Sequence, residues 1–391
     1  MIKYWKKITI FAENQIIMNP FITTGYAGPE YFCDRIEETK ALTDLLMNGN
    51  NVALMSPRRY GKTDLIRHCF SQRIISERYY TFIIDIYSTK SLAEMTERMG
   101  KSILDTLKPK GTQAWSKFVN ALSSLKGGIS YDAAGVPSWT LQIGDLGNPK
   151  TTLDEIFAYL SNADKPCLVA IDEFQQITNY ADKNVEATLR TYIQYCPNAK
   201  FVFSGSHREM MGSMFTSSAR PFYQSATVIN LPPIREELYA EFCKKHFAAA
   251  GKCLDDEVVP ELYKRFDGTT FYLQKVMNIL FMRTNEGETC VKERIADAVD
   301  YIIDFSADTY EDLLYQLPEK QKQIIQAIAL EGKAKKITSR VFVKKYGLSS
   351  ASSVNSAVKG LLEKGLLNCS RGVYQVYDMF FATWLTERYM K

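Results

Sequence analysis

The chain has 391 residues, of which 46% are hydrophobic and 24% charged, and it carries a net charge of +4 at pH 7. These proportions exclude a largely disordered chain, because such chains have too little apolar surface to offset the entropy of ordering. The mild charge excludes a uniformly basic nucleic-acid-binding protein, although it is compatible with a local basic patch. A chain of this length is too long to fold around a single hydrophobic core, so we expect two or three domains.

Residues 1–18 are expected to be a short N-terminal extension, or to precede a true start at Met18. Their apolar run is too short for a signal peptide, and no run elsewhere is long enough for a membrane helix. The eight cysteines show neither a C-x-x-C pair nor zinc-ligand spacing, which predicts reduced thiols in a cytoplasmic protein. His68, His207 and His246 have no partner at metal-ligand spacing, so we interpret them as structural.

Residues 19–233 are predicted to form an α/β domain. Short β-rich runs alternate with helical periodicity, as in a doubly wound parallel sheet with crossover helices. Residues 127–150 interrupt this alternation with glycines and prolines, which predicts an inserted hairpin. The five predicted strands cover residues 51–55, 79–87, 167–171, 200–205 and 226–231.

The C-terminal part has a different pattern. Residues 234–305 contain consecutive amphipathic helical segments, which predicts an all-helical lid domain. Residues 306–391 predict a winged helix-turn-helix, because three helical segments precede a glycine-centred turn between apolar runs. Its helices are expected at residues 319–330, 339–347 and 350–365, and its wing at 366–381.

A phosphate-binding motif lies between the first predicted strand and a helix. Gly61, Lys62 and Thr63 match the end of G-x-x-x-x-G-K-[ST], whereas Ser56 stands at the position of the first glycine. In this motif backbone N–H groups bind phosphates, the lysine neutralises the β and γ oxygens, and the hydroxyl reaches Mg²⁺. We expect Ser56 to reduce the pre-organisation of the loop rather than its chemistry. The expected nucleotide contacts here are Ser56, Pro57, Arg58, Arg59, Tyr60, Gly61, Lys62, Thr63 and Asp64.

A second motif ends the predicted strand at residues 167–171. Asp172 and Glu173 follow this apolar run, and the carboxyl edge of a parallel sheet is where such folds bind ligands. We expect Asp172 to hold Mg²⁺ together with Thr63, and Glu173 to polarise the attacking water.

These motifs together resemble the archaeal-type ATPases of the AAA+/STAND superfamily. The segments that carry the resemblance are FCDRIEE, PRRYGKT, AIDEFQQ, FVFSGS and VYDMFFATWL, and the similarity runs from about residue 19 to the C-terminus. The resemblance implies an AAA+-like P-loop NTPase core with a helical lid and a winged helix, and ATP as the nucleotide. It also implies adenine recognition near Phe32 to Arg35 and a polar sensor at Ser204, with Ser206 as the second choice.

The resemblance leaves the transition-state arginine unassigned. Arg208 and Arg220 are candidates, although each is equally well explained as a surface charge, and the lid offers only Lys275 in place of a sensor arginine. Arg58 and Arg59 add charge toward the γ-phosphate, contact a neighbouring domain, or are solvated on a tight turn. Without a well-placed arginine we expect slow hydrolysis.

The third helix of the winged helix has two faces. The predicted buried face consists of Val354, Ala357, Val358, Leu361 and Leu362, and the outward face of Ser352, Ser353, Asn355, Ser356 and Lys359. Lys344 and Lys345 precede this helix, and Arg371 lies at the wing tip. Such a face is compatible with contacts to DNA bases or phosphates, but winged helices also dock on proteins.

Three functions remain open at this point. The first is a Mg²⁺-dependent ATPase that acts as a switch, with nucleotide between sheet domain and lid repositioning the winged helix. The second is a DNA-binding regulator with a structural or weakly active ATP site. The third is a scaffold that binds a protein partner or self-associates through the winged helix.

Overall fold

The computed structural model describes residues 18–140 and 148–389. The described residues form two compact units, one from Thr24 to Leu238 and the other made of the segment before Thr24 together with the chain from Tyr239 onward. The chain therefore passes between the units twice. Of the extension expected at residues 1–18, only Met18 belongs to the described residues.

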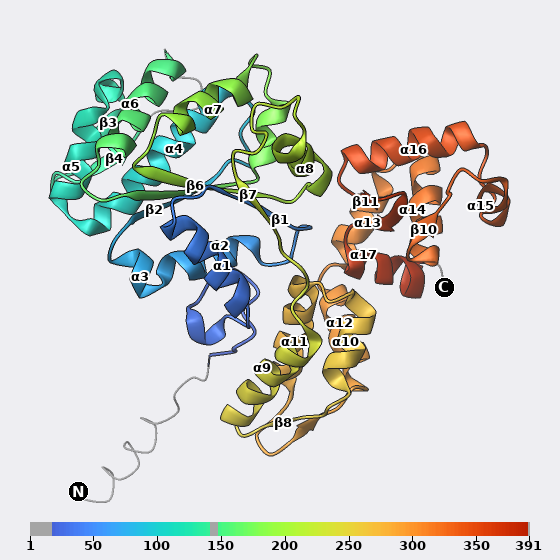
Figure 1. Cartoon of the computed structure of the whole chain (residues 1–391). Helices are drawn as coiled ribbons and strands as arrows, with labels where there is room; N and C mark the ends of the chain where they lie inside the picture. The colour runs from blue at the N-terminus through green and yellow to red at the C-terminus, as the bar shows by residue number, and fades with distance from the viewer. Residues whose placement is uncertain (1–17, 141–147, 390–391) are drawn as a thin grey trace, which may run out of the picture. The chain divides into compact units, whose positions relative to one another are not determined.

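A five-stranded parallel sheet forms the centre of the first unit, in the order β2-β5-β6-β1-β7 (Figure 1). β1 pairs with β6 on one side and β7 on the other, so that Val52 lies opposite both Val202 and Thr227. β1 and β5 are buried along their whole length, as expected for parallel strands covered on both faces. The predicted α/β fold class is confirmed. The strands are β1 (Val52–Met55), β2 (Tyr80–Asp85), β5 (Cys167–Asp172), β6 (Ala199–Gly205) and β7 (Thr227–Asn230).

Helices cover both faces of this sheet (Figure 1). Side chains alternate along each strand, so Val202 packs with the helices of one face and Phe201 and Phe203 with those of the other. The first face carries α1 (Ile36–Met47), α2 (Lys62–Ser71) and α3 (Arg73–Ser76). The second carries α4 (Leu92–Leu107), α5 (Thr112–Ala121), α6 (Pro149–Asn162), α7 (Val185–Gln194) and α8 (Arg208–Thr216).

The region in which an inserted hairpin is expected contains an antiparallel pair, β3 (Ile129–Tyr131) and β4 (Pro137–Trp139). The ring of Trp139 lies against Gly100 of α4, where a Cβ atom would come within 2.3 Å of it. Glycine at this position therefore makes room for the indole. Residues 141–147, also within the expected insertion, lie outside the described residues. Short 3-10 segments are η1 (Pro29–Tyr31), η2 (Lys108–Lys110), η3 (Ser123–Gly128) and η4 (Phe174–Asn179).

The lid is mainly helical. The expectation of an all-helical lid is wrong in one detail, since a two-residue parallel pair joins two of its loops, and strands this short leave no periodicity in the sequence. The lid comprises α9 (Glu236–Ala249), β8 (Cys253–Leu254), α10 (Val258–Phe266), α11 (Thr270–Arg283), β9 (Thr289–Cys290) and α12 (Arg294–Asp304).

The segment before Thr24 is anchored in this lid. Phe21 is fully buried, and its ring makes edge or tilted contacts with the rings of Phe247 and Phe281. The Asn19 side chain donates to the Asn278 carbonyl at 2.9 Å, and the Asn278 side chain donates to the Phe21 carbonyl at 2.8 Å.

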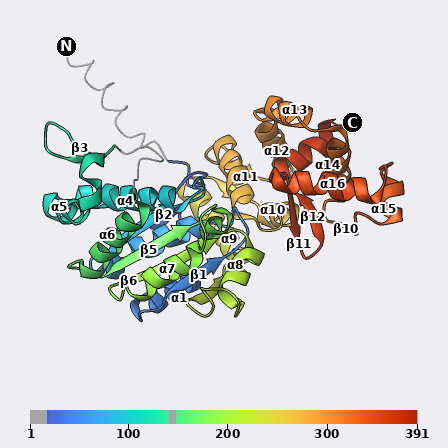
Figure 2. The same ribbon diagram turned by 90° about the horizontal axis from the view of Figure 1, so that it is seen from above.

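The last part of the chain folds as the predicted winged helix (Figure 2). Ser350 caps the third helix by accepting a hydrogen bond from the Ser353 amide. Arg371 and Gly372 form the wing turn, both with positive φ, as a two-residue hairpin favours. Leu362, predicted to be buried, is 37% exposed, because it lies about 100° round the helix from buried Leu361. The elements are α13 (Ala307–Tyr315), α14 (Glu319–Glu331), β10 (Ala334–Lys335), α15 (Arg340–Lys345), α16 (Ala351–Glu363), β11 (Leu367–Ser370), β12 (Val373–Val376), α17 (Met379–Trp384) and the π-helical η5 (Leu385–Tyr389).

Lid and winged helix are joined by direct contacts. The Tyr272 hydroxyl of α11 donates to the Tyr377 carbonyl at 3.2 Å and accepts from the Met379 amide at 3.0 Å. The Phe380 ring packs against the rings of Tyr272 and Phe266, at 5.1 and 5.6 Å between centroids. These buried aromatic contacts connect the two parts into one body.

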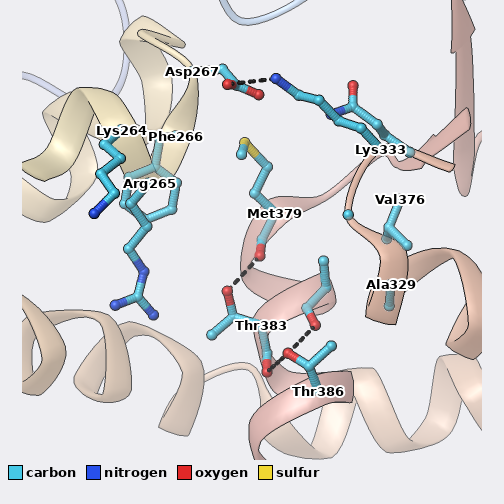
Figure 3. A pocket seen from close by; sticks show the side chains of 13 residues that line it. Lys264, Arg265, Phe266, Asp267, Ala329, Lys333, Val376, Met379, Thr383 and Thr386 are labelled. Carbon is cyan, nitrogen blue, oxygen red and sulfur yellow. Dashed lines mark hydrogen bonds and ion pairs between the residues drawn. The ribbon is translucent and has the colours of Figure 1, made fainter. Parts of the chain in front are cut away.

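A cavity of about 370 Å³ lies at this junction (Figure 3). An ion pair of 2.7 Å between Asp267 and Lys333 spans one side of it, while Met379 points toward its centre. Arg265, another lining residue, pairs with Glu387 at 3.4 Å. None of the helices in the described ranges is both long and apolar enough to cross a membrane.

Candidate nucleotide-binding site

The loop between β1 and α2 is shaped by two residues with positive φ, Arg59 at 70° and Gly61 at 82°. Gly61 caps the start of α2 in the left-handed conformation that glycine adopts without cost. Ser56, at the first position of the motif, is fully buried and does not have a positive φ. Its backbone therefore does not require glycine, which explains how the loop forms with serine there.

Lys62 is turned toward the loop itself. Its Nζ atom donates to the carbonyls of Ser56 and Pro57, both at 3.1 Å, and approaches the Ser56 hydroxyl at 3.4 Å. Burial lowers the pKa of Lys62, and the carboxylates of Glu173 and Asp172 oppose this effect. The three oxygens around Nζ are acceptors that the oxygens of a phosphate can replace. The loop and its lysine thus fit a phosphate ligand.

Thr63 and Asp172 meet at the carboxyl edge of the sheet. The Thr63 hydroxyl donates to Asp172 Oδ2 at 2.5 Å, and Asp172 Oδ1 accepts from the amide of Glu173 at 3.0 Å. A hydroxyl and a carboxylate are hard oxygen donors of the kind Mg²⁺ prefers, usually completed by phosphate oxygens and water. Among the described residues no group of three His, Cys, Asp or Glu side chains could hold a metal by itself. Thr63 and Asp172 therefore suit a Mg²⁺ ion that is also bound by the phosphates of a nucleotide.

Glu173 follows in a left-handed conformation, with φ at 56°. Its Oε2 atom accepts from the Gln175 side chain at 2.5 Å and from the Ser206 hydroxyl at 2.6 Å. Gln175 is almost fully buried, and a Cβ atom on Gly205 would come within 2.5 Å of its Oε1. The absence of a side chain at residue 205 therefore makes room for Gln175. The sequence motifs assign no role to Gln175. Its position two residues after Glu173 is the feature that indicates a place near the site.

The structure brings Ser206, the second choice for the sensor, to Glu173. Ser204, the first choice, is fully buried in β6, and its hydroxyl has no hydrogen-bond partner among the described residues. By strand alternation Ser204 shares the face of Val202, which packs with the helices of the α1 and α2 layer. Ser206 lies just beyond the strand and is free of this constraint.

Arg58 is connected to Glu173 by way of Ser206, which forms a hydrogen bond with each of them. Its Nε atom donates to the Ser206 hydroxyl at 3.2 Å, and its guanidinium lies 5.0 Å from the ring centroid of Tyr87. The charge of Arg58 contributes to the lowered pKa of Lys62.

The other candidate arginines bind elsewhere within their own unit. Arg220 forms an ion pair with Glu186 of α7. Arg208, at the start of α8, donates to the Asn230 side chain at 3.5 Å. Burial raises the pKa of Glu186, and the charge of Arg220 opposes this shift.

The segment expected to recognise adenine contacts the phosphate loop. Arg35 is buried at the start of α1 with φ at 65°, and it donates to Glu38 at 2.8 Å and to the Tyr60 carbonyl at 3.4 Å. Phe32 stacks on the imidazole of His68, with 4.3 Å between ring centroids. Arg35 and Tyr60 thus lie together, whereas Phe32 belongs to an aromatic cluster on α2.

His68 connects this cluster by hydrogen bonds. Its Nδ1 atom lies 2.9 Å from the Tyr26 hydroxyl, and its Nε2 atom lies 3.1 Å from the Gln72 amide nitrogen. Burial lowers the pKa of His68, which favours the neutral ring.

Asp64, the last expected nucleotide contact, lies in the first turn of α2. Burial raises the pKa of its carboxyl, Arg67 opposes the shift, and Asp172 adds to it. Asp64 therefore belongs to the same electrostatic environment as the carboxylate of Asp172.

The exposed face of α16 carries the polar residues that the sequence predicts. Asn355, Ser356 and Lys359 are exposed, as is Arg371 at the wing tip. Lys359 pairs with Glu363 at 3.9 Å, and Lys345, which is also exposed, pairs with Glu331 at 2.6 Å.

The fold and the site together define a class of protein. A five-stranded parallel sheet, a glycine-lysine-threonine loop after β1 and an Asp-Glu pair after β5 define a P-loop nucleoside triphosphatase of AAA+-like architecture with a C-terminal winged helix. Residues 32–276 match the family described as an ATPase domain predominantly from Archaea, and residues 308–387 match a probable winged helix domain. The chain belongs to this archaeal-type ATPase family.

Solved structures show the same fold. The Walker-type ATPase PABY2304 of Pyrococcus abyssi is 19% identical, with a TM-score of 0.62 over 94% of this chain and 99% of that one. The ORC2 protein of Aeropyrum pernix, in ADPNP and ADP complexes, is 16% identical, with a TM-score of 0.55 over 95% and 96%. Identities this low establish a shared fold only. A search of curated proteins finds no match to the chain.

Proposed function

We propose that this protein is a Mg²⁺-dependent ATPase that acts as a nucleotide-operated switch coupled to its winged helix. The observation that carries the proposal is the meeting of Lys62, Thr63, Asp172 and Glu173 at one edge of the sheet, with Thr63 and Asp172 in direct contact. The ORC2 neighbour, described with ADPNP and ADP, supports adenine nucleotides as ligands.

The chain's own residues have separate roles in this mechanism. Lys62 exchanges the carbonyls of Ser56 and Pro57 for phosphate oxygens, and Thr63 and Asp172 provide oxygens for Mg²⁺. When bound, Mg²⁺ supplies positive charge that neutralises the phosphates.

Hydrolysis then needs a positioned base. Glu173 accepts a proton from a water molecule as the water oxygen bonds to the γ-phosphorus. The bond from the γ-phosphorus to the bridging oxygen breaks, and its electron pair stays on ADP. The products are ADP and phosphate.

The switch proposal is supported by the junction between lid and winged helix. Tyr272, Phe266 and Phe380 join the two parts, so a displacement of the lid would carry the winged helix with it. Such coupling requires that ATP and ADP interact differently with the two states.

Nucleotide binding tests the first half of the proposal. We expect Lys62→Ala to weaken ATP binding about 10- to 100-fold, because charge-assisted hydrogen bonds are worth about 1.5–3 kcal/mol. Titration calorimetry would measure this, with Lys101→Ala on the exposed face of α4 as the matched control. An ATP affinity equal to that of the wild type would contradict the proposed site.

A second function, binding of DNA, is favoured by the exposed polar face of α16 and by Arg371 on the wing. A structural neighbour, the ORC1 protein of Aeropyrum pernix, is described in complex with DNA and has 13% identity and a TM-score of 0.50 over 92% of this chain and 94% of that one. We propose that α16 and the wing contact DNA. Docking on a protein partner or self-association is the alternative use of this surface.

A further inference from the structure

We propose that Arg58 is the arginine of the catalytic site and that it acts on the γ-phosphate bound by its own chain. This inference rests on the proposed ATPase function and names a residue for a role that the sequence leaves unassigned. The argument starts from the position of Arg58 in the phosphate loop, four residues before Lys62.

Contacts with Ser206 and Tyr87 orient the Arg58 side chain. Its Nε atom donates to the Ser206 hydroxyl at 3.2 Å, and the face of the Tyr87 ring lies 5.0 Å from its guanidinium carbon. These contacts hold the guanidinium beside the loop that receives the phosphates. Besides Nε, an arginine has two Nη groups, and this pair suits the bidentate recognition of phosphate oxygens.

Ser206 connects Arg58 to the proposed base. Its hydroxyl accepts from Arg58 and donates to Glu173 Oε2 at 2.6 Å. The cation and the carboxylate are therefore held by one side chain. Ser206 is a positioning residue, because it fixes the groups that flank the attacking water without contacting the phosphate itself.

The charges around the phosphate loop are compatible with this role for Arg58. The phosphate loop carries two cations, Arg58 and Lys62, and Arg58 is linked through Ser206 to the carboxylate of Glu173. A triphosphate adds several negative charges to this arrangement, so that a second cation beside Lys62 is stabilised by the ligand. The negative charge on the γ-phosphoryl oxygens is where an arginine acts in such reactions.

Arg208 and Arg220, the two other candidates for the transition-state arginine, have partners elsewhere in the same unit. Arg220 is paired with Glu186, and Arg208 bonds Asn230 at the end of β7. An arginine supplied by the phosphate loop would let the chain hydrolyse ATP without a residue from a neighbouring subunit.

The test compares ATP and ADP affinities of the full chain. We expect Arg58→Ala to weaken ATP binding about tenfold or more and to leave ADP affinity within about twofold, because only ATP has the γ-phosphate. Turnover should fall on the order of 10³-fold, and Arg58→Lys should recover part of both losses. Arg73→Ala, on an exposed arginine of α3, is the matched control and should behave as the wild type.

Mixing experiments decide whether the arginine acts within one chain. Arg58→Ala chains mixed with Glu173→Gln chains should show no recovery of turnover, because neither chain has a complete site. Recovery on mixing, or an unchanged ratio of ATP to ADP affinity in Arg58→Ala, would overturn the proposal. A wild-type chain that binds ATP but releases no phosphate would contradict the ATPase function alone, since the affinity ratio still decides the contact of Arg58. A wild-type chain that binds neither nucleotide would overturn both.

Discussion

At the scale of single residues, the carboxylate of Glu173 has two distinct oxygen environments. Oε2 accepts hydrogen bonds from Gln175 and Ser206, both at 2.6 Å or less. One oxygen is thus held by the protein, and these hydrogen bonds also restrict the direction of the other. Gln175 therefore acts as a positioning residue for the proposed base.

Replacing Gln175 by a carboxylate should change how the reaction depends on pH. We expect Gln175→Glu to raise the pKa of Glu173, because two carboxylates in contact disfavour the ionisation of each other. A base must be deprotonated to act, so the acidic limb of the kcat profile should move to higher pH by about one unit.

The isosteric Gln175→Met should instead lower kcat without moving this limb, since it removes the hydrogen bond and adds no charge. Gln194→Glu, on an exposed position of α7, controls for the added charge. A limb at the same pH in Gln175→Glu and in wild type would show that Gln175 does not position Glu173.

The main contacts of the phosphate loop were predictable at this scale, and two others were not. The positions of Lys62, Thr63, Asp172 and Glu173 follow from the two motifs, because the carboxyl ends of parallel strands meet at one edge of the sheet even though β6 lies between β1 and β5. β6 ends at Gly205, as the sequence predicts, but the contact of Ser206 with Glu173 depends on how the chain turns after the strand, which the pattern does not determine. Gln175 lies beyond the motif, and its contact with Glu173 depends on the turn that follows β5.

At the scale of elements, the central strands follow directly from the sequence. Strands that are buried on both faces appear in the sequence as continuous apolar runs. The observed β5, at residues 167–172, extends one residue beyond its predicted end and includes Asp172. The pair β8 and β9 was not predictable, because two residues carry no period. Leu362 lies at the edge of the buried face predicted for α16 but is exposed, so the predicted face includes one residue too many.

The winged helix offers a prediction about α16 and the wing. We expect the combined Lys344→Ala, Lys359→Ala and Arg371→Ala variant to weaken DNA binding at all sequences, because these cations would bind phosphates. The slope of log affinity against log salt should decrease by up to about 0.9 for each phosphate that the variant no longer neutralises. Gel shifts at several salt concentrations would measure it.

Lys345→Ala is the matched control for this variant, because Lys345 pairs with Glu331 at 2.6 Å, a closer contact than the 3.9 Å between Lys359 and Glu363. We expect it to bind DNA as the wild type does. Unchanged affinity and slope in the triple variant would remove DNA from the proposed function and favour protein docking on this surface.

At the scale of the whole molecule, the order of the elements along the chain differs from their grouping in space. The segment containing Asn19 and Phe21 precedes the sheet in sequence but packs in the lid, through a buried ring and two hydrogen bonds to Asn278. The pattern of residues 19–23 resembles that of any short loop, so this return to the lid was not predictable. It gives the lid a second covalent link to the sheet unit.

The central claim is that the site hydrolyses ATP by means of Glu173. The most direct measurement is steady-state phosphate release by the full chain at saturating ATP and Mg²⁺, compared with that of Glu173→Gln. We expect the variant to bind ATP with wild-type affinity and to release phosphate about 10²- to 10⁴-fold more slowly, as loss of a general base predicts. Release by the wild type no faster than by Glu173→Gln would contradict the account.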